Sequence, residues 1–159
     1  WNGLVWKLRD KLGTDRAVFW WIWSFVSNRK VQVKVDGYKS NGRRTGIGLP
    51  QGSSLSPLLF VLFINDLAKE IDDDVELGLF ADDIVIWTSG EGAMERLQRA
   101  LNATENWCKK WKMVLSTDKC LPIRFWPGRR RANGWWTTGD LFIGAVQLNW
   151  QTKVKYLGI

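Results

Sequence analysis

The stretch Leu77–Trp87, LGLFADDIVIW, places two adjacent carboxylates, Asp82 and Asp83, in the middle of an otherwise apolar run. Apolar residues on both sides predict two strands, Val75–Phe80 and Ile84–Trp87, around a turn that holds both carboxylates. An unpaired charge is costly to bury, so the pair requires an explanation. A solvated turn is the simplest one, since aspartate is common in turns. The alternative is a platform for divalent metal ions at the hairpin tip.

Composition limits the chemistry that is available to the chain. The 159 residues carry a net charge of +7, which favours an anionic partner such as nucleic acid or an anionic membrane surface. There is no histidine, which excludes imidazole bases, Ser-His triads and histidine zinc sites. Two cysteines, Cys108 and Cys120, are too few for a four-cysteine zinc site and imply no disulfide, so we expect an intracellular, reduced protein. Carboxylates with oxygen-binding ions such as Mg²⁺ or Mn²⁺ remain.

Hydrophobic content of 45% is sufficient for a core, and no apolar run reaches the ~18 residues of a transmembrane helix. We therefore expect no membrane partner. The chain starts at Trp1 without an initiator methionine and stops at Ile159 after an apolar run. We expect residues 1–159 to be a fragment of a longer polypeptide.

The remaining pattern is α+β, with helices that support a small antiparallel sheet. We expect a short helix that ends near Gly13 and a second helix through Val18, Trp21, Ile22 and Phe25. A third helix is expected at 57–71, capped by Ser56. A long amphipathic helix should run from Met94 to Trp111. VQVKV at 31–35 alternates and predicts a half-exposed strand, which a DG turn joins to a return strand at 42–49. We expect Trp21 and Trp111 in the core, Trp87 beneath the hairpin tip, and Asp72–Asp74 solvated in a polar turn.

A Gly-rich loop, Gly46–Pro57 (GIGLPQGSSLSP), is the second candidate site. Gly48 and Gly52 allow close approach of a ligand to the backbone, and Gln51 offers both a donor and an acceptor. An ordinary strand-to-helix loop would have the same composition. The loop lacks the Gly-Lys-Ser/Thr of a Walker motif.

Together, GLPQGSSLSPLLFVLFINDL (48–67) and LFADDIVIW (79–87) resemble the reverse transcriptases of non-LTR, LINE-like retrotransposons. Further segments extend the resemblance over nearly the whole chain: WIWSFVSNRKVQVKVDG (21–37), ENWCKKWKMVLSTDKC (105–120) and KYLGI (155–159). The resemblance implies an RNA-directed DNA polymerase with a right-hand fold. This chain would supply the palm, a small antiparallel sheet backed by helices, and part of the fingers.

The resemblance also implies roles for individual residues. Asp82 and Asp83 would be the catalytic carboxylates that bind two Mg²⁺ or Mn²⁺ ions, with Asp82 the better candidate for a direct ligand. Lys119 would neutralise or protonate the leaving pyrophosphate. The nucleotide and the template would lie against Leu49, Pro50, Gln51, Gly52 and Ser53. The primer would lie against Tyr156, Leu157 and Gly158. Template phosphates would contact Arg29, Lys30, Arg43 and Arg44.

Partners implied by the resemblance are an RNA template, a DNA primer, dNTP and the rest of a retroelement polyprotein, such as a thumb or an endonuclease domain. The implied location is the nucleus. The family has one further aspartate, in an apolar strand just before the segment that begins here. None of Asp10, Asp15, Asp36 and Asp66 matches that context, so this segment by itself is expected to be inactive. A maturase of the group II intron type and a non-catalytic RNA-binding remnant are the alternatives.

Overall fold

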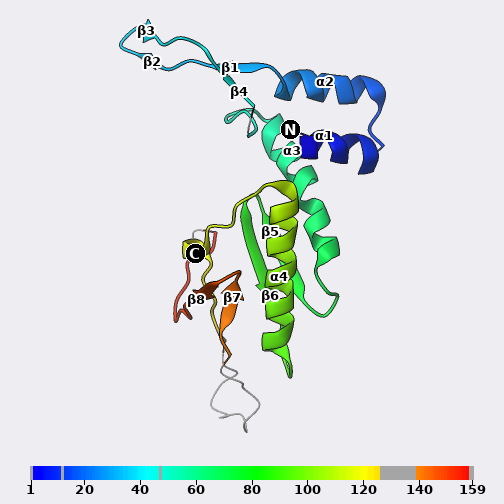
Figure 1. The fold of residues 1–159 in the computed structure, drawn as a ribbon, viewed down its shortest axis with the longest axis vertical. Coiled ribbons are helices and arrows are strands. Elements are labelled where there is room, and N and C mark those ends of the chain that lie inside the picture. The colour runs from blue at the N-terminus through cyan, green and yellow to red at the C-terminus, as the bar shows by residue number, and fades with distance from the viewer. Residues whose placement is uncertain (1, 12, 47, 126–138, 158–159) are drawn as a thin grey trace. The chain divides into compact units, whose positions relative to one another are not determined.

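The computed structural model describes residues 2–11, 13–46, 48–125 and 139–157. The chain divides into two compact units, residues 1–65 and 66–159. Both combine helices with two-stranded antiparallel sheets, which confirms the α+β class (Figure 1). Within the described ranges, no helix is both long enough and apolar enough to cross a membrane.

In the first unit, four helical segments surround one hydrophobic cluster. They are α1 (Asn2–Trp6), the π-helical turn η1 (Lys7–Lys11), α2 (Arg16–Val26) and α3 (Leu55–Ile64). Asp15 caps α2 by accepting hydrogen bonds from the backbone of Ala17 at 2.8 Å and Val18 at 3.4 Å. The cluster comprises Leu4, Leu8, Ile22, Val26 and Leu59. The two predicted N-terminal helices are therefore confirmed.

The buried face of α2 differs from the predicted one. Ile22 and Val26 are buried, with Phe19 and Phe25 packed against the cluster, whereas Trp21 is 60% exposed. The expectation that Trp21 lies in the core was wrong. Because α2 is apolar almost all round its circumference, helical periodicity alone did not select the face that packs.

A long β-hairpin, which we call the arm, follows α2. It contains β1 (Arg29–Val31), β2 (Lys34–Val35), β3 (Tyr38–Lys39) and β4 (Arg43–Thr45), with β1 paired to β4 and β2 to β3. The predicted DG turn is present, with positive φ at Asp36 and Gly37. The single strand predicted at 31–35 is interrupted, because two residues (32–33) face three (40–42) between the paired segments.

Residues 30–44 are all exposed, so the predicted half-buried strand was wrong as well. Val31, Val33 and Val35 each remain more than half exposed. Alternation of apolar and polar residues normally marks one buried face. Within the described residues of this unit, no hydrophobic cluster includes that face of the arm.

Helix α3 begins two residues earlier than the sequence suggested. Ser54, not Ser56, is the N-cap residue, and α3 continues into the 3-10 helix η2 (Asn65–Glu70). The Ser56 hydroxyl instead donates to the Pro50 carbonyl at 2.6 Å. Ser56 therefore holds the Gly-rich loop against the start of the helix. Pro57 lies in the first turn of α3, where its missing N–H costs nothing.

In the second unit, α4 (Ala93–Trp111) packs on two hairpins. The hairpin of β5 (Glu76–Phe80) and β6 (Asp83–Trp87) lies beside α4 (Figure 1). It contacts α4 around Ala100 and Ala103, through Leu77 and Ile86. The other hairpin, β7 (Leu141–Ile143) and β8 (Val146–Leu148), packs on Met94, Leu97 and Leu101. The short 3-10 helix η3 (Thr117–Lys119) lies between α4 and β7 in the chain. The predicted amphipathic helix is confirmed.

Two buried side chains of α4 donate hydrogen bonds, one to a residue of η2 and the other to a carbonyl one turn earlier in α4 itself. The Trp107 indole, 2% exposed, donates to the Asp66 carboxylate at 2.9 Å. The Thr104 hydroxyl donates to the Ala100 carbonyl at 2.8 Å. Asp66 therefore has a structural partner, consistent with leaving it out of the catalytic set. Trp111 is half-buried, with its ring 6.4 Å from that of Trp107.

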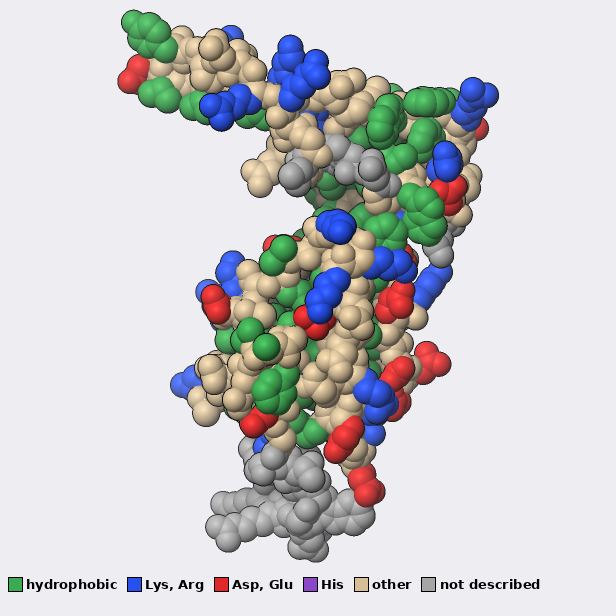
Figure 2. Space-filling model, in the orientation of Figure 1, with side chains coloured by type: hydrophobic (Ala, Val, Ile, Leu, Met, Phe, Trp, Pro, Cys, Tyr) green, Lys and Arg blue, Asp and Glu red, His purple; other side chains and the backbone are tan. Residues whose placement is uncertain are grey.

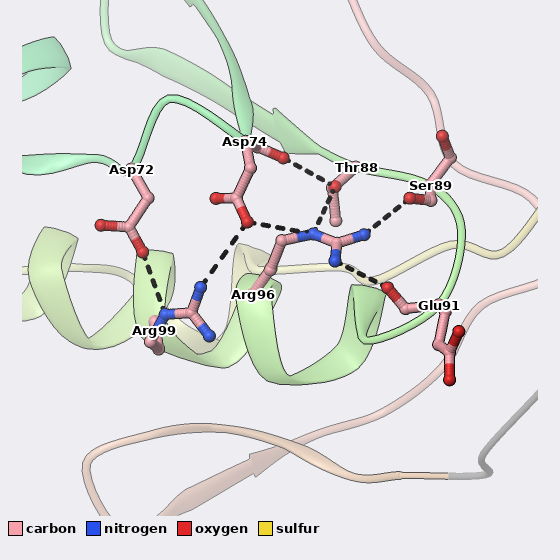
Figure 3. Close-up of polar contacts among 7 residues, drawn as sticks. All are labelled: Asp72, Asp74, Thr88, Ser89, Glu91, Arg96 and Arg99. Carbon is pink, nitrogen blue, oxygen red and sulfur yellow. Dashed lines mark hydrogen bonds and ion pairs between the residues drawn. The ribbon is translucent and has the colours of Figure 1, made fainter.

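Arg96 fastens the open end of the β5–β6 hairpin to α4 (Figure 3). Its guanidinium donates to the Thr88 hydroxyl at 3.1 Å and to the carbonyls of Ser89 and Glu91, each at 2.6 Å. It also pairs with the Asp74 carboxylate at 3.5 Å, while the Thr88 hydroxyl donates to the Asp74 carbonyl at 3.0 Å. One side chain thus joins the residues before β5, the residues after β6 and the first turns of α4.

Arg99 pairs with Asp72 at 2.9 Å and with Asp74 at 3.7 Å, one turn further along α4 (Figure 3). The hydrogen bond that the Arg99 guanidinium donates to the Asp72 carboxylate raises the pKa of Arg99. All three of Asp72–Asp74 are exposed in a turn, which confirms the expected solvated position, and two of them also pair with arginines of α4. Arg96 and Arg99 lie three positions apart, which puts both on the side of α4 that faces this loop.

The turn between β5 and β6 has only two residues, because Phe80 pairs directly with Asp83. Asp83 is the first residue of β6, so the predicted three-residue turn was one residue too long. Ala81 has a φ of 50°, a left-handed conformation that costs a residue with a Cβ roughly 1–2 kcal/mol.

Replacing Ala81 by glycine should relieve this strain. We expect Ala81→Gly to raise the free energy of unfolding by about 0.5–1 kcal/mol, because glycine adopts positive φ freely but is more flexible when unfolded. Thermal unfolding measures the change, at roughly 2–4 °C per kcal/mol for a chain of this size. The control Ala103→Gly, within α4, should lower stability by about 1 kcal/mol or more. A lower midpoint for both variants would contradict the strain at Ala81.

The Arg96 contacts generate a second prediction. Arg96→Lys keeps the charge but cannot reach all four partners, because lysine lacks the planar fork of arginine. We expect a loss of about 1–2 kcal/mol in the free energy of unfolding, measured by denaturant titration. Arg99→Lys is the matched control on the same helix and should behave like wild type, since its pairs are exposed. Equal losses in both variants would show that Arg96 has no special role.

Candidate active site

Asp82 and Asp83 lie together at the tip of the β5–β6 hairpin. Asp82 is in the turn and Asp83 opens β6, and both side chains are exposed. Side chains alternate along a strand, so Asp83 shares a face with its partner Phe80, while Leu77 and Ile86 lie on the face that packs on α4. The tip therefore presents two carboxylates to solvent, and that of Asp83 lies on the face opposite to the one that packs on α4.

The donor set at the tip fits a divalent metal in part. Exposed carboxylate oxygens are the ligands that Mg²⁺ and Mn²⁺ prefer. Among the described residues, neither Asp82 nor Asp83 forms an ion pair, so both retain their lone pairs for an external cation. In the same residues, no group of three potential ligands comes together. Two adjacent carboxylates are thus available, without a third.

Trp87 does not lie where the sequence suggested. It pairs with Glu76, at the opposite end of the hairpin from the carboxylates, and is 49% exposed. Its ring lies over Gly78, where an added Cβ would come within 3.3 Å of it. The expectation that Trp87 packs beneath the site was wrong, because the five-residue ladder separates it from the tip.

The Gly-rich loop lies in the first unit and is shaped by its own hydrogen bonds. The backbone of Ser53 donates to the Pro50 carbonyl at 3.5 Å, which closes a turn with Gly52 at a φ of 84°. A turn with positive φ at its third residue favours glycine. Leu49 packs against the hydrophobic cluster, while Gln51 and Gly52 are exposed at the tip. The loop thus presents Gln51 on a firmly anchored turn.

The remaining predicted contacts of the second unit lie after α4. Lys119 is exposed at the end of η3, and its backbone donates to the Ser116 carbonyl at 2.9 Å. Tyr156 is half-buried, and Leu157 is exposed with a φ of 50°. Gly158, predicted in the same primer-binding turn, lies outside the described residues, as does the basic stretch at 129–131.

Four basic residues were predicted to contact template phosphates, and all lie on the arm. Arg29 donates to the carbonyls of Val26 and Gly48, so it joins the end of α2 to the Gly-rich loop. The other three, Lys30, Arg43 and Arg44, are exposed. Arg29 therefore has a structural task, and the others are open to solvent.

Sequence reasoning missed two further lysines of the arm, Lys34 and Lys39. They lie directly opposite each other across β2 and β3. The signal was present, because a two-residue DG turn at 36–37 pairs Val35 with Tyr38, and the next pair outward is Lys34 and Lys39.

The cysteines offer no competing reactive site. Burial raises the pKa of both thiols, and both cysteines are free. A raised pKa keeps a thiol protonated and unreactive near neutral pH. The carboxylates of the hairpin remain the stronger candidates for chemistry.

Comparison with known proteins identifies the family. Residues 5–159 match the model of the family described as reverse transcriptase (RNA-dependent DNA polymerase). The RNA-directed DNA polymerase from the mobile element jockey of Drosophila melanogaster is 31% identical over 86% of this chain and 15% of its own length. Its counterpart from Drosophila funebris is 30% identical over 99% of this chain and 17% of its own length. A probable RNA-directed DNA polymerase from transposon BS of Drosophila melanogaster is also 30% identical, over 86% and 16% respectively.

The chain thus spans about 15–17% of the length of these relatives. No solved structure matches. The family match covers both candidate segments, the Gly-rich loop and the carboxylate hairpin. Similarity to polymerases of mobile elements supports the non-LTR retrotransposon type that the sequence motifs indicated. The chain belongs to the reverse transcriptase family.

Proposed function

We propose that this chain is the palm and part of the fingers of a retrotransposon reverse transcriptase, and that it acts within a longer protein. The reaction is transfer of a nucleotide from dNTP to the 3′-hydroxyl of a DNA primer on an RNA template. The observation that carries the proposal is the exposed Asp82–Asp83 pair at a hairpin tip, in a chain that matches the family over residues 5–159.

Asp82 and Asp83 would hold two Mg²⁺ or Mn²⁺ ions. Such ions, when bound, activate the attacking hydroxyl and neutralise the triphosphate and its leaving group. The carboxylates supply oxygen ligands and a double negative charge, and the β5–β6 ladder holds them in place. A complete site needs another carboxylate, which we propose comes from sequence outside these residues.

The other predicted residues complete the proposal. Gln51, on the turn closed by Pro50 and Ser53, would meet the incoming nucleotide or template together with Leu49 and Gly52. Lys119 would neutralise or protonate the pyrophosphate. Primer backbone would lie against the turn of Tyr156, Leu157 and Gly158, and template phosphates against Lys30, Arg43 and Arg44, with Arg29 placing the loop beside them.

Primer extension on an RNA template tests the proposal. In a protein that includes the sequence upstream of residue 1, Asp82→Asn should reduce extension at least about 100-fold, because it removes one charged ligand of ions that contribute several kcal/mol. Asp73→Asn, the same substitution at another exposed aspartate, is the control and should leave extension unchanged. Both are measured with Mg²⁺ and with Mn²⁺.

Normal extension by the Asp82→Asn variant would overturn the catalytic assignment. If the wild-type protein binds RNA but extends no primer, the chain is a non-catalytic remnant. If residues 1–159 alone extend a primer and Asp82→Asn does not, a third carboxylate lies within them. The first result would reject Asp82 as a catalytic residue, and the second would reject polymerase activity. The third would reject the proposal that another carboxylate comes from outside these residues.

A further inference from the structure

The Pro50 carbonyl accepts two hydrogen bonds of very different length. The Ser53 backbone N–H donates to it at 3.5 Å, and the Ser56 hydroxyl donates to it at 2.6 Å. N–H···O bonds are normally about 2.7–3.2 Å long and O–H···O bonds about 2.5–3.0 Å long. The bond by which the turn closes itself is therefore weak, and Ser56 supplies the stronger of the two.

Ser56 is itself held in place by the helix that carries it. It is 9% exposed, and its backbone donates to the Ser53 carbonyl at 3.3 Å. Leu59, almost one turn further along α3, is 1% exposed and belongs to the hydrophobic cluster. A buried hydroxyl requires a hydrogen-bond partner, which favours the bond to Pro50. Because α3 is anchored in the core, this bond fixes the loop to the helix.

Two further contacts hold the residues just before Pro50. Leu49 packs against the hydrophobic cluster, and Arg29 donates to the Gly48 carbonyl. Other basic side chains of the arm lie at its surface, as the blue groups along it show (Figure 2). Residues 48–50 are thus held one after another, by a guanidinium, by apolar packing and by the Ser56 hydroxyl.

The carbonyl that Ser56 holds belongs to the peptide unit that joins Pro50 to Gln51. A peptide unit is planar, so fixing the direction of its C=O fixes the whole plane, including the Gln51 nitrogen. Gln51 and Gly52 follow as the two central residues of the turn, and both are exposed. With that plane fixed, the Gln51 side chain keeps only its own φ and its rotamers as freedoms. The hydrogen bond from Ser56 therefore limits where the Gln51 amide reaches.

We infer that Ser56 is a positioning residue, which holds Gln51 in place for the incoming nucleotide. This inference rests on the proposed function, which gives Gln51 the nucleotide as its partner. Ser56 acts by raising the fraction of molecules in which Gln51 is placed to bind, and apparent affinity is proportional to that fraction. One hydrogen bond of ordinary net strength shifts such an equilibrium about 2- to 12-fold.

Nucleotide affinity without chemistry tests the inference. The protein includes the sequence upstream of residue 1, and it is bound with Mg²⁺ to an RNA template whose DNA primer ends in a dideoxynucleotide. Such a primer has no 3′-hydroxyl, so the complex binds dTTP opposite a template adenine without reacting. Ser56→Ala should raise the Kd for dTTP about 2- to 12-fold. Alanine is a good helix former, so the variant should fold.

The matched control is Ser54→Ala, the same substitution two residues earlier. Ser54 is exposed, and its side chain forms no capping hydrogen bond. The Kd for dTTP should therefore remain that of wild type. An equal rise in Kd for Ser54→Ala and Ser56→Ala, or no rise for Ser56→Ala, would overturn the inference.

A double-mutant cycle separates positioning from a general loss of stability. If Ser56 acts through Gln51, then Ser56→Ala should have no further effect on dTTP affinity in a protein that already carries Gln51→Ala. The thermal midpoint should fall equally in both backgrounds, because the bond to Pro50 is lost in each. The same rise in Kd with and without Gln51 would show that Ser56 has a purely structural role.

The outcomes distinguish this inference from the catalytic proposal. If wild type binds dTTP but extends no ordinary primer, catalysis is rejected while the cycle still decides the role of Ser56. If wild type binds no dTTP, both fail. If Gln51→Ala binds dTTP as tightly as wild type, Gln51 has no contact to be positioned for, and this inference alone is overturned.

Discussion

The packing of α4 on the β5–β6 hairpin is the constraint on which the second unit depends. Ala100 and Ala103 are small, which lets the helix approach the strands closely enough to pack on Leu77 and Ile86. Arg96 then fixes the open end of the hairpin by joining the chain before β5 to the chain after β6. Because α4 holds one face of the hairpin and Arg96 holds its open end, the pairing of β5 with β6 fixes the position of the turn that carries the carboxylates. The exposed carboxylates are thus carried by a rigid support, as a metal site requires.

Both candidate binding regions concentrate charge of one sign at a cost in stability. Asp82 and Asp83 are adjacent at a hairpin tip, and Lys30 and Arg44 face each other across the arm. Among the described residues, neither pair has an opposite charge from the chain itself. By contrast, Asp72 and Asp74 are paired with Arg96 and Arg99. Uncompensated like charge therefore distinguishes residues proposed to bind external ligands from residues that stabilise the fold.

Local patterns in the sequence predicted the helices, strands and turns well. They failed where two residues or two helix faces were equally suitable and tertiary packing decided between them. The DG turn, the long amphipathic helix and the strands around the carboxylates follow from short-range preferences, and the structure has them all. The start of α3 was misplaced because Ser54 and Ser56 are both acceptable caps, and Ser56 is used to hold Pro50 instead. Trp21 was misplaced because α2 offers several apolar faces, of which only one packs.

By itself, the sequence determined the α+β class, the hairpin with its two carboxylates, the Gly-rich loop and the family, because each depends on residue types at fixed short spacings. Only the tertiary structure decided that Arg96 and Arg99 hold Asp72 and Asp74, and that Trp107 meets Asp66. Those contacts join residues 22 to 41 positions apart, and no local pattern specifies them. The pairing of Lys34 with Lys39 lies between these cases: the turn implies it, and the register of the ladder shows that both side chains share one face.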